Sequence, residues 1–377
     1  MKAIVNARIV IEGGIIENHA LLFDEKIEGL APLPLVMNDV EIIDAEGAYV
    51  SPGFIDLHIH GSGGADVMDA TPEALEQLST TLLGTGTTGF LATTMTMSKE
   101  EVVAALENVQ KHGGSASGAQ ILGVHLEGPF INPDRHGAQD RRYVSKPEID
   151  MIVPYMEMIK MITLAPEVEG AKQFIADMHS TYPEVILSIG HSDASFELAQ
   201  QSFAWGISHA THLFNAMNPL HHRAPGIVGA VFESDVSCDI IADLVHLHSA
   251  ILSLVYRMKK ERLVLITDAM RAGCMKCGSY DLGGRSVEVG EGKALLSDGT
   301  LAGSVLKMNE ALANMVQHTA MTRTEAVDAV TRLPAQMLDL KKGQLRQGYD
   351  ADIVIFDEDF GIISTIVGGT IKYKKED

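Results

Sequence analysis

The sequence predicts an α/β fold: a (β/α)8 TIM-type barrel joined to a small β-sandwich domain that both chain termini form. Three observations predict it. Between residue 52 and about residue 340, short apolar runs of β type alternate with helical stretches. The runs number eight, the count of parallel strands that closes such a barrel, and a barrel needs about 250 residues. Both ends of the chain carry further short β-type runs between turns.

The terminal runs cover residues 3–5, 20–23, 40–44, 351–356 and 362–371. Neither end holds enough of them for an independent sheet, so we expect the two ends to pair. The expected sandwich comprises residues 1–51 and 345–377, and the expected catalytic barrel comprises residues 52–344.

The eight predicted barrel strands are short and apolar, and several end on a polar residue. They lie at 54–60, 89–94, 121–127, 161–167, 185–191, 207–212, 238–243 and 263–268. Helices are expected to begin near Thr71, Ser98 and Ser145, because each precedes acidic residues of a first turn. The glycine-rich segment 278–303 reads as a hairpin insertion, which we expect to cover the site as either a mobile or a rigid element.

The composition limits the possible partners. Against 29 basic residues the chain has 50 acidic ones, a net charge of −21 that repels nucleic acid and anionic membranes. Apolar runs stay shorter than the ~18 residues of a membrane span, and the N-terminus lacks the pattern of a signal peptide. Three cysteines do not make a disulfide framework. We therefore expect a soluble, cytoplasmic protein with a small-molecule ligand and no nucleic-acid or membrane partner.

Six potential metal ligands follow the predicted strands. In a (β/α)8 barrel the active site lies at the carboxyl ends of the strands, so side chains far apart in sequence meet there. His58 and His60 alternate along the first strand and therefore share one side of it. Together the strand ends predict a shared metal site, formed by His58, His60, Glu127, His191, His212 and Asp268.

The ligand types limit the identity of the metal and suggest a reaction. Imidazoles with carboxylates suit one or two ions of zinc, iron, manganese or cobalt, and no thiolate lies near these positions. One arrangement gives His58, His60 and Asp268 to one ion and His191 and His212 to a second, with Glu127 bridging. A metal-bound hydroxide is then the nucleophile. Asp268 is the predicted catalytic residue, which takes the proton and passes it to the leaving group.

Six blocks of sequence resemble the N-acetylglucosamine-6-phosphate deacetylases of the amidohydrolase superfamily. They are PGFIDLHIHGSGGADVMDAT (52–71), HLEGPFINP (125–133), LAPE (164–167), GHSDA (190–194), THLFNAMNPLHHRAPGIVGA (211–230) and LITDAM (265–270), in the family's order. The resemblance implies a barrel with a composite sandwich, usually a homodimer. It also implies hydrolysis of the sugar-phosphate acetamide to acetate and the free amine, in amino-sugar catabolism. Glu127 stands in for the carbamylated lysine of many relatives, and His60 indicates the two-metal type.

The resemblance also implies residues that bind substrate. Backbone amides of Asn215 and Ala216, with the guanidinium of Arg223, are expected to hold the phosphate. His246 matches a histidine that reaches the phosphate from the neighbouring subunit, and His248 is an alternative for that role. Gln139 stands where many members have a histidine that contacts the sugar or the acetyl carbonyl, and His136 is the alternative for that contact.

Other readings predict different behaviour. The protein could act on N-acetylgalactosamine 6-phosphate, because few contacts distinguish the two epimers. Another amidohydrolase, acting on a cyclic amide, would leave the block from Asn215 to Arg223 unexplained. A non-catalytic barrel would have lost ligands, and none of the six is missing. The Cys274–Cys277 pair lacks a second CxxC, so we do not expect a zinc or redox site there.

Overall fold

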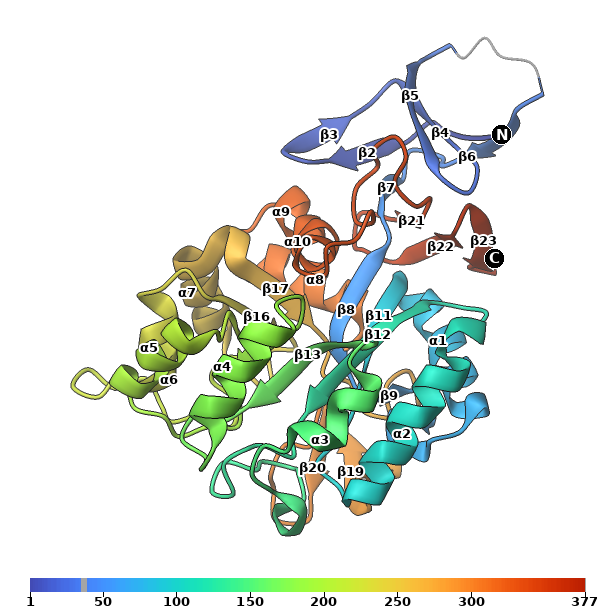
Figure 1. The fold of residues 1–377 in the computed structure, drawn as a ribbon. Coiled ribbons are helices and arrows are strands. Elements are labelled where there is room, and N and C mark those ends of the chain that lie inside the picture. Colours follow the sequence, from blue (N-terminus) through green and yellow to red (C-terminus); the bar gives the residue numbers. More distant parts are fainter. Residues whose placement is uncertain (35–38, 377) are drawn as a thin grey trace.

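The structure, a computed structural model, describes residues 1–34 and 39–376 as a barrel with a smaller β structure beside one end (Figure 1). Both chain ends lie in the smaller structure (Figure 1). Among the described residues no helix combines the length and the apolar character that a membrane span requires.

The barrel is an eight-stranded parallel sheet, as predicted. Neighbouring strands pair in the order β17-β16-β15-β14-β13-β12-β11-β8. All eight predicted runs are confirmed as strands: β8 (Phe54–Ile59), β11 (Thr87–Thr93), β12 (Gln120–Glu127), β13 (Ile159–Leu164), β14 (Ile186–Ile189), β15 (His209–Ala210), β16 (Ser237–Ile241) and β17 (Leu263–Ile266). The first and last strands meet through a bridge between Ile59 and Ala269 and a hydrogen bond from Asp268 N to His58 O (2.9 Å). Every residue of β8, β11 and β17 is buried, because one face lines the barrel and helices cover the other.

Helices follow the strands on the outside of the barrel (Figure 1). Thr71 caps α1 by accepting a hydrogen bond from Ala74 N (3.2 Å), and Ser98 forms a capping box with Glu101 at α2. Two of the three predicted helix starts are therefore confirmed. The helices are α1 (Pro72–Leu82), α2 (Lys99–His112), α3 (Ile149–Ile152), α4 (Ala171–Thr181), α5 (Phe196–Trp205), α6 (Gly226–Phe232), α7 (Ser249–Lys259), α8 (Met308–His318), α9 (Arg323–Asp328) and α10 (Arg332–Met337).

The predicted helix start at Ser145 is wrong. The helix α3 begins after Glu148 and has only four residues. Pro147 disfavours a helical conformation at Lys146, and Ser145 N donates instead to Pro129 O (2.9 Å). The segment therefore continues as a loop where the sequence pattern suggested a helix.

The terminal segments build two sheets. A six-stranded sheet combines both ends in the order β23-β22-β21-β7-β2-β3, and β21 pairs antiparallel with β7. A second sheet, β5-β4-β1-β6, comes from the N-terminal segment alone. Their strands are β1 (Lys2–Val5), β2 (Arg8–Ile11), β3 (Gly14–Ile16), β4 (His19–Phe23), β5 (Ile27–Pro32), β6 (Glu41–Asp44), β7 (Tyr49–Pro52), β21 (Ile353–Phe356), β22 (Ile362–Val367) and β23 (Thr370–Lys374).

The expectation that neither end holds a sheet of its own is wrong for the N-terminal end. There β1 pairs antiparallel with β4 and parallel with β6, so the segment closes a four-stranded sheet without the C-terminal residues. A shared apolar core, which includes Ile4, Phe23, Val50 and Ile355, joins the two sheets into the predicted sandwich. The boundaries after residue 51 and before residue 345 stay predictions.

The insertion after β17 forms the predicted hairpin and adds a third strand. The strands β18 (Gly278–Leu282), β19 (Arg285–Gly290) and β20 (Lys293–Leu296) are antiparallel. Gly283 and Gly284 form the first turn, both with positive φ (57° and 78°), the conformation that a two-residue hairpin turn requires. Arg285 Nη1 donates to Ala138 O (3.2 Å) and so ties the hairpin to the loop after β12. That this hairpin is a mobile or a rigid cover stays a prediction.

Candidate active site

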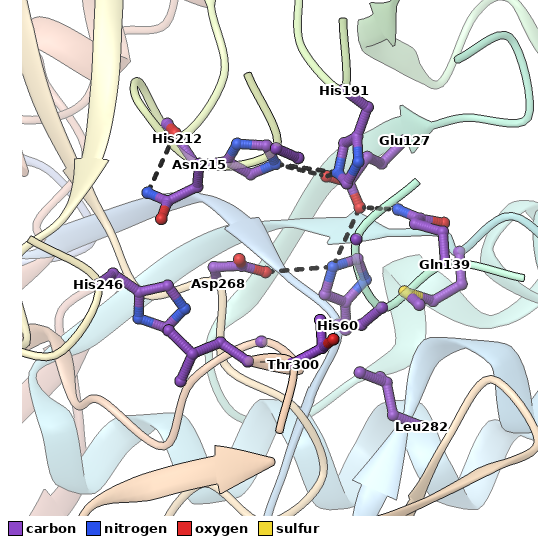
Figure 2. A pocket seen from close by; sticks show the side chains of 16 residues that line it. His60, Glu127, Gln139, His191, His212, Asn215, His246, Asp268, Leu282 and Thr300 are labelled. Carbon is purple, nitrogen blue, oxygen red and sulfur yellow. Dashed lines mark hydrogen bonds and ion pairs between the residues drawn. The ribbon is translucent and has the colours of Figure 1, made fainter. Parts of the chain in front are cut away.

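The six predicted metal ligands converge at the carboxyl end of the barrel. His58 lies in β8, and Glu127 ends β12. His60 directly follows its strand, and His191, His212 and Asp268 lie two residues after the ends of theirs. His191, His212 and Asp268 have positive φ (48°, 35° and 48°), a conformation that costs a residue with a side chain about 1–3 kcal/mol. The chain turns sharply at these three positions, and the turns direct the side chains into the barrel mouth (Figure 2).

The first pair of imidazoles lies between two carboxylates. His58 Nε2 and His60 Nε2 are 3.2 Å apart. Each lies near Asp268 Oδ1, at 3.4 and 3.2 Å. Glu127 approaches from the other side, 3.5 Å from His58 Nε2 and 3.3 Å from His60 Nε2.

The second pair shares the same glutamate. His191 Nε2 and His212 Nε2 are 3.2 Å apart and lie 3.1 and 3.0 Å from Glu127 Oε1. Glu127 therefore belongs to two buried triads, one with His58 and His60 and the other with His191 and His212. This is the arrangement that the sequence predicted for a bridging carboxylate.

A pocket opens onto these side chains. Loops after several strands and the β18–β20 hairpin line it (Figure 2). Of the predicted substrate residues, Gln139, Asn215, Ala216 and His246 line this pocket, and Arg223 does not. The full lining is His60, Met95, Glu127, Gly137, Ala138, Gln139, His191, His212, Asn215, Ala216, His246, Asp268, Leu282, Thr300, Leu301 and Gly303.

Comparison with known proteins agrees with this geometry. The model of the amidohydrolase family matches residues 49–372. The chain belongs to the amidohydrolase family. Members of this family are metal-dependent hydrolases of carbon–nitrogen bonds.

Individual relatives are similar over nearly their whole length. An N-acetylglucosamine-6-phosphate deacetylase of Lysinibacillus sphaericus is 43% identical, with 88% of each chain covered. An N-acetylgalactosamine-6-phosphate deacetylase of Escherichia coli O157:H7 is 36% identical, with 93% of each chain covered. A crystal structure of N-acetylglucosamine-6-phosphate deacetylase from Pasteurella multocida superposes with a TM-score of 0.94 at 32% identity, covering 99% of this chain and 100% of that one. The resemblance read from the six sequence blocks is thus confirmed.

The ligand set of this amidohydrolase suits a metal. His191 Nδ1 donates to Arg135 O (2.8 Å), and His60 Nδ1 donates to Thr93 O (3.3 Å). A neutral imidazole with its proton on Nδ1 has a lone pair on Nε2. Lone pairs of both rings then point at the oxygens of Glu127, an arrangement that needs a cation between ring and carboxylate, either a metal ion or, in its absence, a proton on Nε2. The residues therefore fit a bound metal ion, and the carbonyl acceptors orient the rings as they do in known metal sites.

The two carboxyl groups are ready to bind a cation. Burial alone would raise the pKa of Glu127, but His58 and His191 offset it and hold this pKa well below its usual range. Burial likewise opposes ionisation of Asp268, and His58 and His60 lower its pKa to about 2. Both groups are therefore carboxylates at neutral pH.

Two buried aspartates, absent from the predicted set, support the ligands from below. Asp56 accepts hydrogen bonds from His58 N (3.2 Å) and from the Thr267 hydroxyl (2.6 Å). Asp239 accepts from His212 N and pairs with His209 Nε2 at 2.8 Å. Asp56 lies two residues before the first histidine, and this spacing is the one sequence signal that could have pointed to it.

Gln139 contacts the centre of the site directly. Its Nε2 donates to Glu127 Oε2 (2.5 Å), and its Oε1 accepts from Thr96 N (2.5 Å). His136 is outside the pocket lining, and its Nδ1 bonds to the backbone oxygen of Gln139 (2.9 Å). The geometry therefore favours Gln139 over His136 as the residue that faces a ligand.

The remaining predicted contacts are placed differently from the expectation. His246 lines the pocket of its own chain, so no second subunit is needed to bring this imidazole to the site. Its Nδ1 is held by Asp243 Oδ2 (2.7 Å). The backbone N–H of Asn215 already donates to His212 O (2.9 Å), because it closes a tight turn after β15. Arg223 is exposed and bonds to His222 Nε2 (2.8 Å).

Sequence reasoning missed four residues of the pocket lining, three of them apolar. Met95 follows β11, Leu282 ends β18, and Thr300 and Leu301 follow β20. The hairpin was predicted to cover the site, but a single sequence carries no signal for which of its residues face inward.

Proposed function

We propose that the chain hydrolyses the acetamide of N-acetylglucosamine 6-phosphate and releases glucosamine 6-phosphate and acetate, as a cytoplasmic enzyme of amino-sugar catabolism. One observation carries the proposal: two histidine pairs share Glu127 beside Asp268, in a pocket that Asn215, Ala216 and His246 also line. The histidines and the two carboxylates suit a metal-assisted hydrolysis. Asn215, Ala216 and His246 offer polar partners for a phosphate.

His58, His60 and Asp268 would hold one ion, His191 and His212 a second, and Glu127 both. A divalent ion bound there supplies a Lewis acid that polarises the amide carbonyl and activates water. The nitrogen and oxygen donors suit zinc, iron, manganese or cobalt.

Asp268 is the catalytic residue of this proposal. Its Oδ1 lies 3.2 Å from His60 Nε2, and its side chain is 12% exposed, at the pocket surface. As a carboxylate it takes a proton from the attacking water, and as a carboxylic acid it delivers that proton to the leaving amine nitrogen. Gln139 donates to Glu127 and holds that carboxylate in place.

The phosphate end of the site involves His246, Ala216 and the side chain of Asn215, all of which line the pocket. Arg223 lies outside that lining, so we infer that it makes its predicted phosphate contact in the pocket of a second copy of the chain. An exposed apolar groove lies beside Arg223, and its walls include Leu220 (42% exposed) and Met258 (46% exposed). Exposed apolar patches of this kind mark protein interfaces, so we infer a homodimer that buries this groove.

The test is acetate release by metal-loaded protein from N-acetylglucosamine 6-phosphate, the unphosphorylated sugar and N-acetylgalactosamine 6-phosphate. We expect the first substrate to be preferred, in line with the higher identity to the relative named for glucosamine (43%) than to the one named for galactosamine (36%). Preference for the galacto epimer would keep the chemistry and change the substrate. Absence of acetate from all three would refute the proposal.

A further inference from the structure

We propose that Met95 and Leu282 form the slot that receives the methyl of the substrate's acyl group, and that this slot limits the enzyme to short acyl groups. The inference rests on the proposed function and extends it from the sugar to the acyl specificity. It names two residues that no motif of the sequence singled out.

The two buried apolar side chains of the pocket, Met95 and Leu282, lie on one side of it. Figure 2 shows Leu282 beyond His60, away from Asn215 and His246, which lie on the far side of Asp268. Met95 belongs to the Leu282 side, because its Cε lies 3.6 Å from the position that a Cβ on Gly283 would occupy. Met97, two residues after Met95, packs against the buried cluster that contains Met95 and Leu282.

The chemistry of an N-acyl sugar phosphate indicates that this apolar side of the pocket receives the acyl methyl. The phosphate and the ring hydroxyls need polar partners, whereas the acyl methyl gains free energy from leaving water. Three large apolar side chains line the pocket: Met95, Leu282 and Leu301. Met95 and Leu282 are 3% and 2% exposed, while Leu301 is only half-buried. The two fully buried side chains are therefore the ones suited to a buried methyl.

The slot has close-packed walls. Leu282 packs in a buried cluster with Met270, Val287 and Leu296, and Met95 belongs to that cluster. The hairpin tip is held by the bond from Arg285 to Ala138 O (3.2 Å). Next to Met95 in the chain, Thr96 N donates to Gln139 Oε1 (2.5 Å). This hydrogen bond holds the backbone beside Met95 in place. Since close-packed walls do not expand to admit further carbons, the slot should reject longer acyl chains.

The experiment measures kcat/KM for N-formyl-, N-acetyl-, N-propionyl- and N-butyryl-glucosamine 6-phosphate. For the wild type we expect the N-propionyl substrate to be at least about 10-fold poorer than the N-acetyl one. Leu282→Ala and Met95→Ala should each raise the propionyl-to-acetyl ratio about 10-fold or more, because each removes part of the slot wall. Leu296→Ala is the matched control: it truncates a leucine of the same cluster that does not line the pocket, and the ratio should stay within about 2-fold of wild type.

The outcomes separate the two proposals. If the wild type releases acetate but neither slot variant changes the acyl ratio, the slot is wrong and the proposed function stands. The same holds if Leu296→Ala changes the ratio as much as Leu282→Ala does. If the wild type hydrolyses none of the four substrates, both proposals fail.

Discussion

Asp56 and Thr267 bond across the junction where the first and last barrel strands meet. The Thr267 hydroxyl donates to Asp56 Oδ2 at 2.6 Å, and Thr267 N donates to Asp56 Oδ1 at 3.3 Å. Asp56 lies two residues before His58, and Thr267 lies one residue before Asp268. This side-chain link therefore sets the distance between ligands that come from opposite ends of the barrel domain.

Thr267→Val should destabilise the protein by about 1–3 kcal/mol, because the fully buried carboxyl group of Asp56 loses its short hydrogen bond to the Thr267 hydroxyl. Urea unfolding measures the change. Thr87→Val is the control, since the Thr87 hydroxyl is also buried but bonds to the neutral hydroxyl of Thr85 (3.0 Å). If both variants lose the same free energy of unfolding, the hydrogen bond between Asp56 and Thr267 contributes no more to stability than an ordinary buried hydroxyl pair.

His60→Asn should remove one metal ion and leave the other. The triad of Glu127, His191 and His212 does not include His60, so we expect about two equivalents of metal in the wild type and about one in the variant. Elemental analysis of protein reconstituted with a single metal gives the count. His221→Asn changes an exposed histidine and should bind as the wild type does. A variant that binds no metal, or still binds two, would contradict two separable sites.

Gln139→Ala should lower kcat/KM about 10- to 100-fold, because Glu127 loses a donor that orients it. His136→Ala should change kcat/KM by less than about 3-fold, since the His136 ring bonds to the backbone of Gln139 and does not line the pocket. Steady-state kinetics on N-acetylglucosamine 6-phosphate distinguish the two. A larger loss for His136→Ala would reverse the assignment of the substrate contact.

Asp66 should make the stability of the metal-free protein depend on pH. Burial raises the pKa of this carboxyl from its ordinary value to about 6, although His60 and Arg271 oppose the shift. A carboxyl whose pKa is higher in the folded state favours folding fully below its unfolded pKa, near 4, and loses that contribution as the pH rises through 6.

Asp66→Asn keeps the acceptor for Met68 N (2.9 Å) but cannot ionise. Relative to the wild type, it should therefore gain about 2–3 kcal/mol of unfolding free energy between pH 4 and pH 8. Urea titrations at several pH values measure the gain. Asp134→Asn, at an exposed site, should run parallel to the wild type. A constant difference between Asp66→Asn and the wild type would show that Asp66 does not titrate in this range.

The sequence predicted what local patterns and chain order determine. Eight apolar runs located the strands, and the rule that barrel sites lie at carboxyl strand ends brought His58 and Asp268 together across some 210 residues. Side-chain support such as that of Asp239 was not predictable, because its partners His209 and His212 are set by the register of neighbouring strands. That Leu282 faces the pocket depends in the same way on how the hairpin packs against the barrel.

A single sequence also does not show which residues lie near a second chain. The last prediction concerns one such residue. Arg223 is exposed and lies outside its own pocket, so we expect it to act in the site of a partner copy. Arg223→Ala alone should lose activity on the phosphorylated substrate, as should Asp268→Asn alone. The exposed Arg142→Ala serves as the matched control and should keep wild-type activity.

Mixing the two inactive variants tests this placement. In a mixed dimer, the Arg223→Ala subunit keeps Asp268 and receives Arg223 from its partner, so one of its two sites is complete. Random exchange of equal amounts should therefore restore about a quarter of the wild-type activity, because half of the dimers are mixed. Acetate release before and after subunit exchange measures the recovery. If activity does not return although mixed dimers have formed, Arg223 acts within its own chain or not at all.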